Sequence, residues 1–416
     1  MDLMNSQHSL ISHPEDFVYF SLYAPVSVRE LLDSADGRGR IRQLPAVHLF
    51  FATKDLESEE VARLLPHVTE EQWTAILDLD VWLCDKVRPE AFIFWQRYII
   101  AAQDAVSRKL IRAADPELWE LIFKREVQVY EKTEEDDYEQ NVGEGECLLT
   151  PDGNFLIVLP PKSERSGLLR DLILRLYDLE PQYAARLIVS SQWRTSMEIE
   201  EEGYQSRRRR MEELGFQDYF EALEIYAYLP PGEPLPEKQL QTISPVSTLP
   251  VKLPPVENQG LILFQALAAI VSSDEAQILL EELVFVSNKI LSADQVSIAD
   301  QAKVKQGIRK AIMGVNLGLD WWSDGDFSKA VRGLQGNYLQ SFFQVGHSRL
   351  EELRKEALIA KNNSPQEFGS FEEAFLEGLS EGYPLLVEVQ DGRIKKRLLS
   401  TVKDLKTARE ILHSLK

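Results

Sequence analysis

Four consecutive arginines, at positions 207–210, are the residues in this sequence best suited to bind a charged group. On a helix of about 3.6 residues per turn, Arg207 falls on an apolar stripe and Arg210 lies at its edge. The stripe consists of Tyr204, Met211 and Leu214. Because a buried guanidinium without a partner is very costly, the fold or a ligand must supply one for Arg207.

Two interpretations of this arginine pair remain open. In the first, an internal carboxylate or backbone carbonyl accepts hydrogen bonds from Arg207. In the second, an anionic ligand or a carboxylate of a partner protein binds there. The candidate contacts of that second site are Arg207, Arg210, Tyr204 and Trp193. The two arginines in the middle of the run each have an acid four residues later, a spacing that allows ion pairs on a helix surface. These pairs are Arg208 with Glu212 and Arg209 with Glu213.

Two adjacent tryptophans, Trp321 and Trp322, lie in an acidic segment whose spacing we compared with a calcium-binding loop. Counted from Asp320, the third position is Trp322 and the twelfth is Val331, where the loop needs an oxygen ligand and a bidentate glutamate. We therefore interpret the segment as a turn, with Asp326 capping the next helix. Since aromatic residues are enriched at interfaces, Trp321 and Trp322 form a candidate interaction surface.

Familiar catalytic and metal-binding motifs are absent from the sequence. It has no phosphate-binding Gly-x-x-x-x-Gly-Lys-Ser/Thr loop, no nucleophile elbow and no His-Glu-x-x-His motif. The six histidines are scattered, and Cys84 and Cys147 lack metal-ligand spacing. The sequence therefore predicts no catalytic residue, no metal site and no cofactor. Carboxylates are so numerous that paired-acid catalysis is neither located nor excluded.

The composition is that of a globular protein with an acidic surface. Of 416 residues, 44% are hydrophobic and 27% are charged, and the formal net charge is -21. A field of this sign repels phosphates, so we expect neither nucleic acid nor an anionic membrane surface as a partner. We find no apolar stretch of membrane-spanning length and no signal peptide, and the two cysteines fit a reducing compartment. We therefore expect a cytoplasmic protein without membrane insertion.

Helix signals dominate the chain. Capping residues at the expected spacing predict helix starts at Ser27 with Glu30, Thr69 with Gln72, Asp115 with Pro116, Ser272 with Glu275 and Ser292 with Gln295. Gly37 is expected to close the first helix. Apolar residues recur at helical spacing from Phe92 to Val106. A long helix is expected from about Tyr338, with a buried stripe formed by Tyr338, Phe342, Val345 and Leu353.

Two short β-hairpins interrupt these helices. Asp152–Gly153 lies between apolar runs at 147–149 and 155–159, and Asp391–Gly392 lies between runs at 385–389 and 394–399. A last helix follows, capped by Thr401. The predicted fold is therefore mainly α, either a helical bundle or an irregular stack of short helices, with two minor β-hairpins.

Changes in composition predict the domain organisation. The segment 132–146 is acidic, and eight of the chain's 20 prolines fall between Pro230 and Pro255. We expect an N-terminal arm at 1–26, an N-terminal helical domain at 27–131, an acidic loop at 132–146, a β-hairpin plus helical segment at 147–229, a proline-rich linker at 230–258, and a C-terminal helical domain ending in a hairpin and a helix at 259–416.

Several of these stretches resemble an uncharacterised bacterial family that is defined as a domain of unknown function. They are residues 44–82, Tyr204-x-x-Arg207 to Phe216, Glu221 to Tyr226, Val315 to Leu319, Phe343-x-x-Gly346 and Leu398 to Leu405. The resemblance spans most of the chain and implies no activity, substrate or cofactor. Residues 44–83 also show a weaker likeness to the stacked helices of the magnesium-channel cytosolic domain and of the flagellar rotor switch protein. That likeness implies a role in interaction and regulation.

Two functional hypotheses follow from the sequence. The first is a cytoplasmic helical interaction or scaffold protein whose partner is another protein. The alternative is a small-molecule-responsive regulator, or an unrecognised enzyme, with an anion site near Arg207 and Arg210. Neither the partner nor the oligomeric state is specified by the sequence.

Overall fold

The computed structural model describes residues 27–132, 145–161, 163–238, 260–270, 273–363, 369–390 and 392–415. The expected N-terminal arm (1–26), most of the acidic loop (133–144), the later part of the proline-rich segment (239–259) and the expected cap at Ser272 lie outside these residues. The described chain divides into two compact units. The N-terminal unit contains residues 27–214 together with 297–299, and the C-terminal unit contains the rest.

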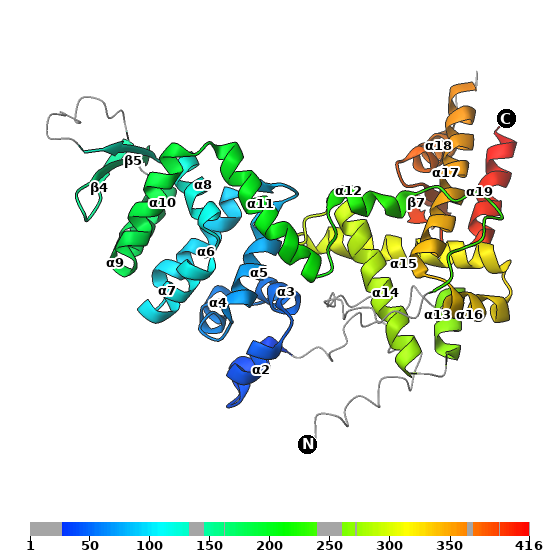
Figure 1. Cartoon of the computed structure of the whole chain (residues 1–416). Helices are drawn as coiled ribbons and strands as arrows, with labels where there is room; N and C mark the ends of the chain where they lie inside the picture. Colours follow the sequence, from blue (N-terminus) through cyan, green and yellow to red (C-terminus); the bar gives the residue numbers. More distant parts are fainter. Residues whose placement is uncertain are drawn as a thin grey trace. The chain divides into compact units, whose positions relative to one another are not determined.

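The N-terminal unit consists mainly of short helices (Figure 1). They are α1 (Val28–Leu32), α2 (Gly37–Gln43), α3 (Ala46–Asp55), α4 (Ser58–Leu64), α5 (Glu70–Asp80), α6 (Pro89–Ala101), α7 (Asp104–Ala113), α8 (Pro116–Glu126), α9 (Glu164–Leu179), α10 (Pro181–Trp193) and α11 (Ser196–Glu213). Helix α5 packs on α3 and α7, and α8 packs on α10 and α11. Their core is built around fully buried tryptophans, among them Trp73 and Trp95, whose rings meet edge to face at 5.3 Å.

Local capping chemistry explains several of these helix starts. The Thr69 side chain accepts a hydrogen bond from the Gln72 N–H and Gln72 reaches back to Thr69, as the sequence predicts. Ser27 also caps its helix, by accepting from the Glu30 N–H. Asp115 precedes Pro116 at the start of α8, but its side chain makes no capping bond. The Asp115 carboxylate instead forms an ion pair with Arg210.

Two expectations for the N-terminal helices are wrong. Gly37 opens α2 instead of closing α1, and glycine is needed there because a Cβ would lie 1.8 Å from the Leu31 carbonyl oxygen. The apolar run that begins at Phe92 is not one helix: α6 ends at Ala101, and Val106 belongs to α7. Periodicity alone continues across this break because both helices bury the same kind of face.

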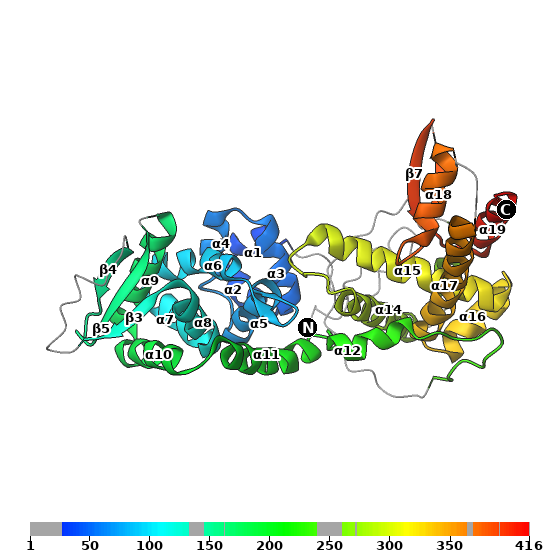
Figure 2. The same cartoon turned by 90° about the horizontal axis from the view of Figure 1, so that it is seen from above.

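A small antiparallel sheet completes the N-terminal unit, with α9 packed against its central strand (Figure 2). Strands β4 (Gly145–Leu149) and β5 (Phe155–Pro161) form the predicted hairpin around Asp152–Gly153. Strand β3 (Gln128–Glu131) pairs with the other edge of β5. A further two-stranded ribbon, β1 (Trp82–Leu83) with β2 (Lys86–Val87), follows α5.

Within its described residues, the C-terminal unit combines short helices with three long ones, α14 (Ser273–Ala293), α15 (Gln301–Ser323) and α17 (Leu339–Asn363). The short helices are α12 (Tyr219–Ala222), the 3-10 helix η4 (Leu223–Tyr226), α13 (Ile262–Ala269), α16 (Phe327–Gly336), α18 (Ser370–Ser380) and α19 (Val402–Ser414). Helices α15 and α17 make the closest contact, because glycines occupy their crossing. A Cβ at Gly318 would lie 1.7 Å from the Phe342 carbonyl oxygen, and one at Gly346 would lie 2.3 Å from that of Gly314.

The remaining elements of this unit follow the sequence prediction, with one exception. Strands β6 (Leu385–Gln390) and β7 (Arg393–Leu398) form the second hairpin, and Thr401 caps α19 by a capping box with Asp404. The predicted helix start at Ser292 and Gln295 is wrong, because Ser292 lies in the last turn of α14 and Gln295 follows its end. Gln295 adopts a left-handed conformation there, and the Val296 N–H returns to the Leu291 carbonyl.

The predicted fold class is confirmed. Helices account for most of the described residues, and the strands form small antiparallel sheets of two or three strands. Within the described ranges, no helix combines the length and the apolar character needed to span a membrane.

Candidate functional site

Internal carbonyl groups hold Arg207 in the N-terminal unit. Its Nε donates to the carbonyl oxygen of Asp78 at 2.9 Å, and its Nη1 donates to that of Cys84 at 3.1 Å. The guanidinium also lies over the Trp82 ring, 5.6 Å from its centroid. Burial lowers the pKa of Arg207, and the negative charge of Asp78 opposes that shift. Arg207 thereby joins α11 to the end of α5 and to the turn between β1 and β2.

Two aspartates hold Arg210. Its Nε donates to Asp78 Oδ2 at 2.6 Å and its Nη2 donates to Asp78 Oδ1 at 2.9 Å, while Nη2 also donates to Asp115. Asp78 is only 1% exposed. Burial raises its pKa and Arg210 opposes this shift. Burial by itself would lower the pKa of Arg210, but Asp78 and Asp115 outweigh it and raise that pKa.

These contacts match the first of the two interpretations drawn from the sequence. Asp115, at the N-cap of α8, forms an ion pair with Arg210 instead of capping its helix. Tyr204 is half-buried on α11, whereas Trp193 ends α10 with 81% of its surface exposed. In the middle of the arginine run, Arg208 forms the expected ion pair with Glu212 at 3.0 Å. The described contacts therefore satisfy this cluster without an external anion.

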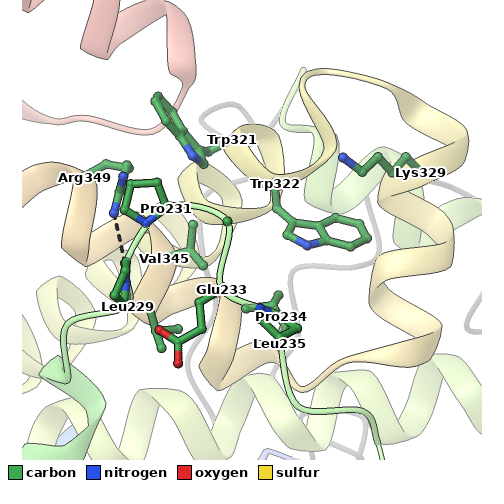
Figure 3. Close-up of a pocket in the computed structure, with 12 residues that line it drawn as sticks. Leu229, Pro231, Glu233, Pro234, Leu235, Trp321, Trp322, Lys329, Val345 and Arg349 are labelled. Atoms are coloured by element: carbon green, nitrogen blue, oxygen red, sulfur yellow. Dashed lines mark hydrogen bonds between the residues drawn. The ribbon is translucent and has the colours of Figure 1, made fainter.

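A pocket of about 330 Å³ lies in the C-terminal unit, around the predicted tryptophan surface (Figure 3). Trp321 and Trp322 come from the end of α15, Lys329 from α16, and Val345 and Arg349 from α17. Residues 229–235 line the remaining side. In Figure 3, Arg349 and Trp321 lie on one side of the pocket and Trp322 and Lys329 on the other. Its volume is at the lower end of the range for ligand pockets, roughly 300–1,000 Å³.

The side formed by residues 229–235 belongs to a proline-rich strap, which we define as residues 229–238. At one end, the Leu229 N–H donates to Ser348 Oγ at 2.8 Å. At the other end, Lys238 donates through its N–H to the Gly336 carbonyl at 2.8 Å and forms an ion pair with Glu282 at 2.8 Å. Between these ends, residues 230–234 are exposed. Proline cannot donate a backbone hydrogen bond, so this part of the strap is fixed chiefly at its ends.

The two cations of the pocket differ in how completely they are paired. Arg349 is 2% exposed, donates to the Leu229 carbonyl at 2.9 Å and pairs with Glu352 at 3.1 Å, yet its Nε is buried without a hydrogen-bond partner. Lys329 lies over the Trp322 ring at 4.8 Å. No carboxylate in the described part of the chain forms an ion pair with Lys329. The pocket therefore combines two indole rings with an engaged guanidinium and an ammonium that retains hydrogen-bonding capacity.

Sequence reasoning located the tryptophans but missed Lys329, Arg349 and the strap as parts of one site. Arg349 could have been singled out from its spacing along the helix. It lies four residues after Val345 and seven after Phe342, on the predicted buried stripe of the long helix. A charged residue on such a stripe needs a partner, which is the reasoning that singled out Arg207.

A polar cluster elsewhere in this unit also escaped the sequence analysis. Asp294 accepts a hydrogen bond from Tyr226 Oη at 2.6 Å and pairs with Lys310 at 2.7 Å. The Lys310 ammonium lies between the rings of Tyr226 and Tyr383, at 4.7 and 4.6 Å from their centroids. His347 stacks near Tyr383, and burial lowers the pKa of His347 to about 4. This cluster fastens η4 to α14, α15 and α17.

The fold and the pocket define a mainly α-helical protein of two compact units, with an aromatic, cationic pocket in the second. The chain belongs to DUF6178, a family of unknown function whose model matches residues 21–416. The family resemblance inferred from the sequence is thereby confirmed. No curated protein and no solved structure matches the chain. Within the described residues, no group of three or more His, Cys, Asp or Glu side chains is placed to hold a metal ion.

Proposed function

We propose that this protein is an interaction or scaffold protein whose C-terminal unit binds a segment of another protein in the pocket beside the strap. The observation that carries the proposal is the convergence of Trp321, Trp322, Lys329 and Arg349 on one half-open pocket. Tryptophan and arginine are the residues most often found at energetic centres of protein interfaces. The exposed strap adds apolar proline surface to the same pocket.

The composition supports a cytoplasmic protein that acts on other proteins. The net charge of -21 disfavours nucleic acid as a partner. Cys84 and Cys147 are free thiols, as expected for a reducing compartment. The alternative of an anion site at Arg207 and Arg210 has no specific observation in its favour, because internal acceptors engage both guanidinium groups.

Site-specific photo-crosslinking in cells of the source organism tests the proposal. A benzophenone amino acid replaces Glu233, an exposed residue of the strap that lines the pocket. The control carries the same amino acid at Ile278, an exposed residue of α14 in the same unit. We expect a discrete protein adduct at position 233 that is absent at position 278. Identical adduct patterns at the two positions, or none at 233, would contradict the proposal.

A further inference from the structure

The described residues that line the pocket carry a net charge opposite in sign to that of the chain as a whole. Lys329 and Arg349 line the pocket, whereas the net charge is -21. The one acid that lines the pocket is Glu233, and Figure 3 shows its carboxylate turned away from Lys329. A local positive region in an acidic protein selects for negatively charged groups, because the remaining surface repels them.

The charge that a group bound in the pocket can carry depends on how much of the positive charge of the pocket is still unpaired. Among the described residues, no carboxylate pairs with the Lys329 ammonium, whereas Arg349 is only 2% exposed and its Nε is buried. Two acids lie close by: Glu352 pairs with Arg349, and Asp326 caps α16 by accepting from the Lys329 N–H at 2.6 Å. A singly charged carboxylate suits this balance better than a phosphate dianion, which the two acids would repel more strongly.

The apolar part of the pocket adjoins the ammonium. Lys329 lies over the Trp322 ring, so a carboxylate that reaches its Nζ comes close to the indole. Trp321, Val345 and the prolines of the strap supply the other apolar walls. A flat or branched apolar group next to the carboxylate would pack between the indoles and these prolines.

From these features we infer that the pocket recognises a carboxylate adjacent to an aromatic or branched apolar side chain, presented by an extended segment of a partner protein. Lys329 is the specificity-determining contact for the carboxylate, and Trp322 packs on the neighbouring side chain. The inference rests on the proposed function and adds to it the chemistry of the partner segment. The strap stays in place, because its ends are fixed by the hydrogen bonds of Leu229 and Lys238.

A peptide array with matched pairs tests the inference. Each peptide carries an aromatic or branched residue next to either Glu or its uncharged counterpart Gln, in an otherwise neutral sequence, and free indole-3-acetate is assayed in parallel. The full-length protein is compared with Lys329→Gln and with Lys305→Gln. Lys305 is an exposed lysine of α15, so the control removes the same charge from the same unit.

The expected result is a roughly tenfold preference for Glu over Gln peptides, as a charge-assisted hydrogen bond gives. This preference is lost in Lys329→Gln and kept in Lys305→Gln. Equal binding of Glu and Gln peptides would overturn the inference and leave the proposed function standing. If indole-3-acetate binds and no peptide does, the carboxylate belongs to a small molecule and not to a partner protein. This result would overturn the proposed function as well. Absence of binding by every probe would overturn both.

Discussion

The Arg207–Arg210 cluster and the Trp321–Trp322 pocket both contain cations beside aromatic rings, but they differ in their partners. In the N-terminal unit, carbonyls of the chain engage Arg207, and Asp78 with Asp115 engages Arg210. In the C-terminal unit, the Lys329 ammonium lies over the Trp322 ring and pairs with no carboxylate among the described residues. The comparison teaches that internal acceptors can engage the arginines that stand out in a sequence, while a single lysine in an ordinary helix can lie in a pocket without an acidic partner.

The physical basis of the difference is desolvation. Asp78 is 1% exposed, so its charge is supportable only with a partner at hydrogen-bonding distance. Lys329 is half-buried at the pocket rim and keeps part of its hydration. Removing a charge from the first site should therefore damage the fold, and removing one from the second should damage binding.

The largest effect is expected for Asp78→Ala. This substitution leaves Arg210 without its bidentate partner inside the unit, and breaking a buried ion pair costs about 3–5 kcal/mol. Chemical denaturation followed by tryptophan fluorescence measures the loss. The control is Glu212→Ala, which removes an exposed pair with Arg208 worth about 0.3–0.5 kcal/mol. Equal losses for the two variants would remove the structural role assigned to the cluster.

A pH-dependent loss of stability is expected from His347, the buried member of the polar cluster in the C-terminal unit. Burial lowers the pKa of His347 to about 4, whereas the unfolded value is about 6.5. Between these values the unfolded chain binds the additional proton, so stability falls as the pH drops from about 6.5 towards 4. The difference amounts to about 3 kcal/mol. Charged groups that face His347 include Lys310, Asp294, Glu351 and Arg354.

Comparing the wild type with His347→Gln checks this dependence, because both proteins share every other titrating group. The free energy of unfolding of the wild type, relative to that of the variant, should decrease as the pH falls through this interval. A constant difference between the two proteins from neutral pH down to about 4 would show that His347 does not titrate as the geometry requires.

An intermediate effect is expected for Arg207→Lys. The lysine keeps the positive charge but cannot reproduce two hydrogen bonds directed at the carbonyls of Asp78 and Cys84. We expect a loss of about 1–3 kcal/mol, the cost of leaving a buried acceptor unsatisfied. The same denaturation assay measures it. Unchanged stability would mean that charge, and not hydrogen-bond geometry, is what the site requires.

The smallest effect on stability is expected for Lys329→Gln. Its contact with the Trp322 ring is a partly exposed cation–π interaction, worth about 0.5–1 kcal/mol. Thermal denaturation should therefore place the variant within about 1 kcal/mol of the wild type. A loss approaching that of Asp78→Ala would show that Lys329 is structural, and the contrast between the two sites would disappear.

Local chemistry made much of the fold predictable from the sequence. The capping box at Thr69, the turn at Asp152–Gly153 and the helix that begins near Tyr338 each depend on residues close in sequence. The predicted helix end at Gly37 and the predicted helix start at Ser292 with Gln295 were wrong, because the same residue types occur at both ends of helices. At position 37 glycine is required by the close approach of the Leu31 carbonyl oxygen, which the local pattern does not reveal.

The candidate site was less predictable, since residues far apart in the sequence form it. The stripe predicted for the long helix passed over Arg349, although its spacing from Phe342 and Val345 places it on the same face. The need of Arg207 for a partner could be inferred from its own helix, but the partners, at Asp78 and Cys84, could not. Lys329 has no sequence feature that separates it from other lysines.

Competitive lysine labelling tests the central claim most directly. An amine-reactive reagent is applied to the purified protein and to living cells of the source organism, and the modification of Lys329 and Lys305 is compared by mass spectrometry. Our account predicts that Lys329 is modified more slowly in cells than in the purified protein, while Lys305 is modified equally in both. Equal modification of Lys329 in the two samples would contradict the claim that a partner occupies this pocket.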